Sequence, residues 1–384
     1  MPGPCVNAKK YLNFRKINLM LRFVAAITVI VLLIGAPLTG IYLSERPADA
    51  LLEFPPMTTE SPRAQPPFSF TVFVFIVLAI LAVVLPFVVK VIRNQGKTHS
   101  LIDKPRNFPG WGWAGAALLS AGWVLAWTRF SWFGPFQIHT FLPLWLGYII
   151  LANALTFMRS GRSLLTHLPV YFLALFAGSA LFWWYFEYLN LMTENWYYRN
   201  LGHMDRHQYF WYATLPFATV LPAVMSTKKL LETFPGFIAG LDAFVKMPLP
   251  GLRQAAIPLM LLAATALAAT AIWPWSLYPM LWLAPLVIVG AGFVVAGKST
   301  LFAGISAGNW KQPYLWGMAA LVCGFFWELW NTNSLAGWSY AIPFVDRYHL
   351  FEMPAAGYAG YLPFGLLCGL VCGLIKDILP DRWL

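Results

Sequence analysis

Long stretches of apolar residues, each close to the length of a membrane-spanning helix, run through the whole sequence. A helix needs about 20 mostly apolar residues to cross the hydrocarbon core of a bilayer. Ten stretches meet this requirement, with approximate edges: 20–43, 68–92, 112–128, 138–158, 164–186, 209–226, 254–274, 277–297, 312–329 and 358–375. The pattern therefore predicts an all-α polytopic membrane protein with about ten transmembrane helices.

The composition excludes the other common classes of protein. Of the 384 residues, 59% are apolar and 11% are charged, whereas soluble domains contain about 45–50% apolar and about 25% charged residues. A soluble enzyme, a disordered chain and a coiled coil are incompatible with these values. The four cysteines lie in apolar surroundings and match neither a disulfide framework nor a zinc site.

The distribution of the basic residues predicts how the chain is oriented. If the N-terminus is cytoplasmic, all but six of the 26 lysines and arginines fall on the inner side, as the positive-inside rule requires. The six on the outer side are Arg46, Arg63, Arg129, Arg199, Arg206 and Arg347. We therefore expect an even number of crossings of the cell (inner) membrane, with both termini in the cytoplasm. This placement accounts for the net charge of +11 without a nucleic-acid partner.

One polar signature occurs twice in the chain. The first copy consists of Glu187, Asn190, Trp196, Tyr198, Asp205, Arg206 and His207, and the second of Glu328, Asn331, Trp338, Tyr340, Asp346, Arg347 and His349. Corresponding residues are separated by 141 or 142 positions. An aromatic-rich composition can align Trp and Tyr by chance, but it does not readily align Glu, Asn, Asp, Arg and His with them. The signature therefore predicts an internal duplication.

The duplication defines the expected domain organisation. Residues 1–108 form a two-helix region with an outer Pro-rich loop, 109–226 the first four-helix repeat, 227–249 a cytoplasmic connector, and 250–384 the second repeat with a short cytoplasmic tail. A unit with an even number of crossings returns to its starting side, so both repeats have the same topology. Both copies of the signature are then expected on the outer face.

The acids of the signature are its main chemical feature. Glu187 and Glu328 lie at the outer ends of apolar helices, where an unpaired charge is costly. In one interpretation they are structural, and Arg206 and Arg347 neutralise them while the signature ties an outer loop over the helix ends. In the other, the signature is a site for proton exchange or ligand binding. The candidate catalytic residues are then Glu187, Glu328, Asp205, Asp346, His207 and His349, and the candidate ligand-binding residues are Asn190, Asn331, Trp196, Trp338, Tyr198, Tyr340, Arg206 and Arg347.

A few short motifs in the sequence bear on which metal or cofactor the protein could bind. His203 and His207 have the helical spacing of metal ligands, but no third ligand accompanies them, so no metal is expected. The stretch 292–299 matches the phosphate-binding loop pattern letter for letter, yet it ends an apolar helix, and no haem or iron–sulfur spacing is present. The cofactor is unknown, and a quinone is compatible with the signature.

Three functions remain open. The first is binding or processing of an amphiphilic ligand (a quinone, an isoprenoid or another lipid) at the outer leaflet, where rings such as Trp183 and Trp327 could stack on it. The layout is similar to that of the quinol-handling membrane subunits of the polysulfide-reductase type, a similarity of architecture that carries over no residue. The second is a membrane subunit that docks a periplasmic or membrane protein partner, and the third is a transporter. Whether the protein is an enzyme stays open.

Overall fold

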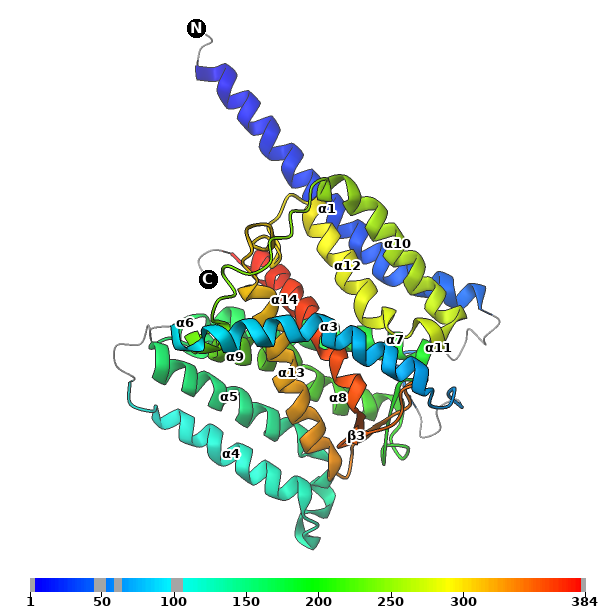
Figure 1. Ribbon diagram of the computed structural model, residues 1–384. Coiled ribbons are helices and arrows are strands. Elements are labelled where there is room, and N and C mark those ends of the chain that lie inside the picture. The colour runs from blue at the N-terminus through cyan, green and yellow to red at the C-terminus, as the bar shows by residue number, and fades with distance from the viewer. Residues whose placement is uncertain (1–3, 45–52, 59–63, 98–105, 381–384) are drawn as a thin grey trace.

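The computed structural model describes residues 4–44, 53–58, 64–97 and 106–380, and the side chains of the first helix from residue 20 onward. Most of this chain is α-helical (Figure 1), so the prediction of an all-helical protein is confirmed. The predicted outer residues Arg46 and Arg63 lie outside the described ranges. The N-terminal part of α1 and the C-terminal end of α14 lie on the side opposite the short β-strands (Figure 1).

Helices account for most of the elements in the described ranges, and four short strands complete them. The α-helices are α1 (Pro4–Leu43), α3 (Phe70–Asn94), α4 (Gly110–Trp127), α5 (Phe141–Ser160), α6 (Leu164–His167), α7 (Pro169–Thr193), α8 (Arg206–Phe217), α9 (Val220–Leu231), α10 (Leu252–Ile272), α11 (Pro274–Leu277), α12 (Met280–Val295), α13 (Lys311–Thr332) and α14 (Tyr361–Ile378). Short 3-10 helices are η1 (Gln95–Lys97), η2 (Ser131–His139), η3 (Pro235–Ile238), η4 (Ile305–Ala307) and η5 (Ala355–Gly360). The strands are β1 (Trp196–Tyr198), β2 (Trp338–Tyr340), β3 (His349–Leu350) and β4 (Met353–Pro354).

Six segments of the described chain are long and apolar enough to cross a membrane. They are Met20–Leu43, Phe70–Asn94, Phe141–Ser160, Pro169–Thr193, Leu252–Ile272 and Ala355–Ile378. The other four predicted spans correspond to α4, α8 with α9, α12 and α13, which are shorter or less apolar. The structure is thus compatible with a membrane protein, while the number of ten crossings stays a prediction.

The stretch 209–226 forms two helices instead of one continuous span. Pro216 and Pro222 lack the amide hydrogen of a helical residue, and the helix is interrupted between α8 and α9. Ser179 of α7 stabilises the interruption, because its hydroxyl donates to the carbonyl of Phe217 (2.6 Å) and accepts from the amide of Leu221 (3.0 Å). Backbone groups freed inside a membrane need such partners.

The helices pack in corresponding pairs around one core. Helix α4 packs along α5 as α10 packs along α12, while α7 lies against α8 and α9 as α13 lies against α14. Trp145 of α5 and Trp330 of α13 are the largest fully buried side chains, and their ring centroids are 5.0 Å apart. The core therefore joins the part of the chain before residue 231 to the part after 311.

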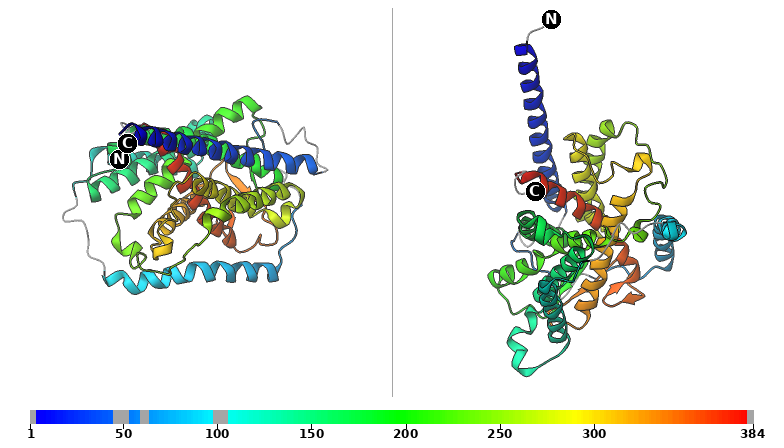
Figure 2. Two further views of the ribbon diagram at one scale, coloured as in Figure 1. Left: turned by 90° about the horizontal axis from the view of Figure 1, so that it is seen from above. Right: turned by 90° about the vertical axis from the view of Figure 1, so that its left-hand side faces the viewer.

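Helix α3 is the exception to this close packing. It lies at one edge of the molecule in both views of Figure 2, lengthwise in the left view and end-on in the right, and none of its apolar stretch is buried. Its ends are attached: the amide of Ser69 donates to the carbonyl of Phe344 (2.9 Å), and Lys90 donates to the carbonyl of Ala243 (2.8 Å). Between these ends, α3 contacts the rest of the protein mainly through one face.

Candidate functional site

The first part of the candidate site is a two-stranded ladder formed by the two copies of the signature. Strands β1 and β2 pair antiparallel, with Trp196 opposite Tyr340 and Tyr198 opposite Trp338. Each strand follows the end of a long helix, β1 after α7 and β2 after α13. Because a Trp of one copy faces a Tyr of the other at both ends of the ladder, the pairing is reciprocal.

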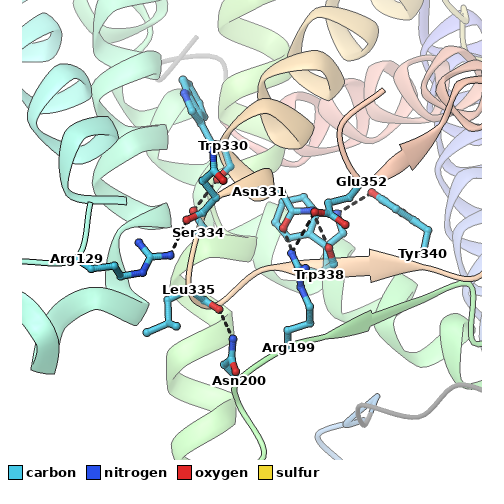
Figure 3. Close-up of polar contacts among 11 residues, drawn as sticks. Arg129, Arg199, Asn200, Trp330, Asn331, Ser334, Leu335, Trp338, Tyr340 and Glu352 are labelled. Atoms are coloured by element: carbon cyan, nitrogen blue, oxygen red, sulfur yellow. Dashed lines mark hydrogen bonds and ion pairs between the residues drawn. The ribbon is translucent and has the colours of Figure 1, made fainter. Parts of the chain in front are cut away.

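An asparagine ties each strand to its helix. The Asn190 side chain donates to the carbonyl of Trp196 (2.7 Å) and accepts from the amides of Asn195 (2.9 Å) and Trp196 (3.3 Å). Asn331 does the same to Trp338, donating to its carbonyl and accepting from its amide, both at 2.7 Å (Figure 3). The sequence predicts ligand binding for both asparagines; in the structure their amide groups are bonded to the strand backbone.

Glu187 lies fully buried beneath the first strand. One of its carboxyl oxygens, Oε1, accepts hydrogen bonds from the Tyr198 hydroxyl (2.6 Å) and from the indole nitrogens of Trp183 (2.9 Å) and Trp196 (3.1 Å). The carboxyl group therefore fixes the orientation of three aromatic rings. Its second oxygen, Oε2, is buried and accepts no hydrogen bond from the described residues.

Glu328 repeats this arrangement in the second copy. It is fully buried, and its Oε1 accepts from the hydroxyls of Tyr340 (2.6 Å) and Tyr361 (2.8 Å). The indole of Trp338 donates to the Tyr340 hydroxyl (2.7 Å; Figure 3). Trp338 is thus linked to the carboxyl of Glu328 through that hydroxyl. The Oε2 atom of Glu328 is again buried without a partner in the described chain.

The expected neutralisation of these acids by Arg206 and Arg347 is wrong. Arg206 forms an ion pair with Glu53 and donates to the carbonyl of Pro55 (2.9 Å). The guanidinium of Arg347 lies over the rings of Phe68 (5.2 Å) and Tyr348 (5.6 Å). Both arginines follow a turn that carries them to the protein surface, away from the helix ends where the glutamates are buried.

The remaining charged residues of the signature also lie at the surface. Asp205 caps the start of α8 by accepting from the amide of Gln208 (2.8 Å), and His207 accepts from the indole of Trp211 (3.2 Å). Asp346 and His349 are paired at 2.8 Å, and both are exposed. The structure thus brings together the Glu, Asn, Trp and Tyr of each copy, and it separates them from the Asp, Arg and His.

A large cavity lies next to the buried glutamates. Its volume is about 740 Å³, and it is bounded by α3, α5, α7, α8, α12, α13 and α14 together with the segments around β1 and β2. Fifteen of its lining side chains are aromatic, and none of those in the described chain is Asp, Glu, Lys, Arg or His. All the rings that bond to the two glutamates belong to this lining: Trp183, Trp196, Tyr198, Tyr340 and Tyr361.

The glutamates therefore lie behind the wall of the cavity, and their ring partners form the wall itself. Trp183 of the first copy and Trp327 of the second approach each other with ring centroids 6.5 Å apart. Trp282 of α12 stacks between Phe186 (4.7 Å) and Trp196 (5.9 Å). One continuous aromatic wall thus joins the two acidic positions.

Several wall residues were not among the candidates from the sequence. Tyr361 has no tyrosine counterpart in the first copy, so the repeat did not reveal it, and Trp282 lies far from both signatures along the chain. Helix α3, which contributes Phe75, Ala79 and Val83 to the lining, lies outside both repeats.

Comparison with family models, curated proteins and solved structures gave no match to the chain.

Proposed function

We propose that this membrane protein binds an amphiphilic ligand, such as a quinone, an isoprenoid or another lipid, in the aromatic cavity. The observation that carries the proposal is the cavity of about 740 Å³ whose described lining is largely aromatic and aliphatic. Concave, mostly apolar sites of about 300–1,000 Å³ are typical of small-molecule binding. An apolar cavity of this size favours a ligand whose own apolar surface is removed from water on binding.

In this proposal the two glutamates position the wall and do not touch the ligand directly. Each carboxyl bonds the polar atoms of its aromatic partners, and the same rings line the cavity. Fixing the rings in advance lowers the entropy cost of ordering them on binding. A direct catalytic role for Glu187 or Glu328 would require the unpartnered Oε2 atoms to reach the ligand.

We further propose the membrane arrangement that the sequence predicts: ten crossings of the cell membrane, both termini in the cytoplasm, and the cavity on the outer side. The reciprocal pairing of β1 with β2 supports a duplicated unit, because a two-fold relation makes residue i contact j and j contact i. The corresponding helix pairs α4 with α5 and α10 with α12 support it in the same way.

Mass spectrometry of co-purifying lipids tests the proposal. The protein is purified in lipid nanodiscs, and its extracted lipids are compared with those of two tryptophan variants on α3. Ala79 lines the cavity, whereas Ala82 is exposed on the same helix and is not part of the lining. We expect Ala79→Trp to lose an enriched lipid that Ala82→Trp retains.

The two variants also define the result that would contradict the proposal. Lipids that merely surround α3 are affected equally by both substitutions, whereas a ligand in the cavity is lost only in Ala79→Trp. Equal retention or equal loss of the enriched lipid in both variants would therefore contradict binding in the cavity. No enriched lipid in the wild-type protein, together with a stoichiometric protein partner, would instead favour a docking subunit.

A further inference from the structure

Two buried acids lie beside the cavity without a basic partner among the described residues, and this concerns the charge of the ligand. Glu187 and Glu328 are both fully buried, and neither forms an ion pair within the described residues. Each has one carboxyl oxygen without a hydrogen-bond partner there. A buried carboxylate is normally paired with a cation, so ionisation of either acid calls for a positive group that the described residues do not supply.

The arginines near strands β1 and β2 do not supply this positive group. Arg206 pairs with Glu53. Arg199 is 3.6 Å from Glu352, and Arg129 donates to the carbonyl of Asn333 at 2.7 Å (Figure 3). Arg347 lies over the rings of Phe68 and Tyr348. All four described arginines near the strands are therefore bonded to other partners outside the cavity lining.

The cavity wall is suited to a cation. The faces of Trp, Tyr and Phe rings carry negative partial charge and attract ammonium groups within about 6 Å of the ring centroid. Trp183, Trp196 and Tyr198 all line the cavity and all bond to Glu187, so a cation at their faces lies one ring away from a carboxyl group. An anion in the same position would meet the ring faces and the carboxyl groups without any basic side chain.

We propose that the polar group of the ligand is positively charged: a lipid or lipid-like molecule whose amine or quaternary ammonium lies against the aromatic wall between Glu187 and Glu328. This inference rests on the proposed function and adds the charge of the ligand to it. The apolar part of the ligand then fills the aliphatic side of the cavity, along α3.

Three probes with the same chain and different heads test the inference. Hexadecyltrimethylammonium is the cation, 2,2-dimethyloctadecane replaces its nitrogen with carbon, and hexadecyl sulfate is the anion. Binding is measured by isothermal titration into protein-loaded nanodiscs, and the signal of empty nanodiscs is subtracted. We expect the ammonium to bind at least about tenfold more tightly than its carbon isostere, as a desolvated cation–π contact provides, and the sulfate to bind most weakly.

A charge-removing variant locates the effect. The double substitution Glu187→Gln with Glu328→Gln keeps an acceptor for the aromatic donors and removes both potential negative charges. We expect the ratio of ammonium to isostere affinity to fall at least about fivefold in this variant. A ratio that stays at the wild-type value would overturn the assignment of the two glutamates.

The outcomes also separate this inference from the proposed function. If the isostere binds as tightly as the ammonium and Ala79→Trp weakens both, the cavity binds neutral ligands and the inference on charge fails alone. If the sulfate binds most tightly, it fails as well. If no probe binds above the empty-nanodisc signal and Ala79→Trp changes nothing, the proposed function fails with it.

Discussion

Trp196 and Tyr340 face each other across the β1–β2 ladder, yet their side chains donate hydrogen bonds to two different buried glutamates. The Trp196 indole reaches Glu187 and the Tyr340 hydroxyl reaches Glu328. The ladder therefore connects the two acidic positions through paired backbone, and a shift of one strand by a single residue would direct the side chain on that strand to the opposite face. Changes at one acid are expected to affect the rings of the other.

The two hydrogen-bonded asparagines are expected to be structural. Asn190→Leu removes both bonds to Trp196 and leaves buried backbone groups without partners, which costs about 1–3 kcal/mol. We expect a lower free energy of unfolding, measured by denaturation in detergent. Asn333→Leu is the control, because Asn333 is exposed at the end of α13. Equal stability of the two variants would contradict the role of Asn190.

For the stability of the protein, the hydrogen-bond-accepting oxygen of the Glu187 side chain is expected to matter more than the charge of that side chain. Glu187→Gln keeps an oxygen that can accept from Trp183, Trp196 and Tyr198, whereas Glu187→Leu leaves all three donors unpaired. We expect the Leu variant to be less stable than the Gln variant by about 2 kcal/mol or more. Near-ultraviolet circular dichroism reports ring order, and the Leu variant should lose signal first. The same spectrum in both variants would contradict this ranking.

Gly324 permits the close approach of Tyr361 to α13. A Cβ atom at this position would lie 2.4 Å from the Tyr361 ring, which bonds to Glu328 one turn further along the helix. We expect Gly324→Ala to destabilise the protein by about 1–3 kcal/mol through overpacking. Gly317→Ala on the same helix is the matched control, since its Cβ would meet Leu362 at an ordinary 3.5 Å. That control should be neutral or stabilising by about 0.5–1 kcal/mol; thermal unfolding ranks the two.

One ion pair outside the six long apolar segments of the described chain gives a pH dependence. The hydrogen bond from Lys311 to Asp242 (3.0 Å) holds the pKa of that carboxyl below its usual value. Its stabilisation is therefore present above the unfolded pKa of about 3.9 and is lost as the pH falls through the lower folded pKa. The pair is exposed, so Asp242→Asn should cost less than about 1 kcal/mol at neutral pH. A cost that increases below pH 4 would contradict this sign.

The sequence predicted the helical architecture and grouped Glu187 with Trp196 and Tyr198, because these residues are close along the chain and share one helix end. It could not predict the position of Arg206, since its partner Glu53 is 153 positions away and lies before the first repeat. The β1–β2 pairing was also missed. Strands of three residues carry little periodic signal, and this register depends on two asparagines that are 141 positions apart.

The cavity depended on packing that no local pattern specifies. Tyr361 and Trp282 enter the aromatic wall because α14 and α12 lie against the first repeat. The role of α3 follows from its position at the edge of the molecule, which its largely apolar sequence does not encode.

In the proposed function, the attachment of α3 at Ser69 and Lys90 determines which concentration governs the occupancy of the cavity. This wall is a single, largely apolar helix, so a ligand that entered past it would come from the hydrocarbon phase and not from water. Half-saturation then occurs at a fixed mole fraction of ligand in the membrane. Diluting the protein with more bilayer at constant total ligand would empty the cavity, even though the aqueous volume never changes.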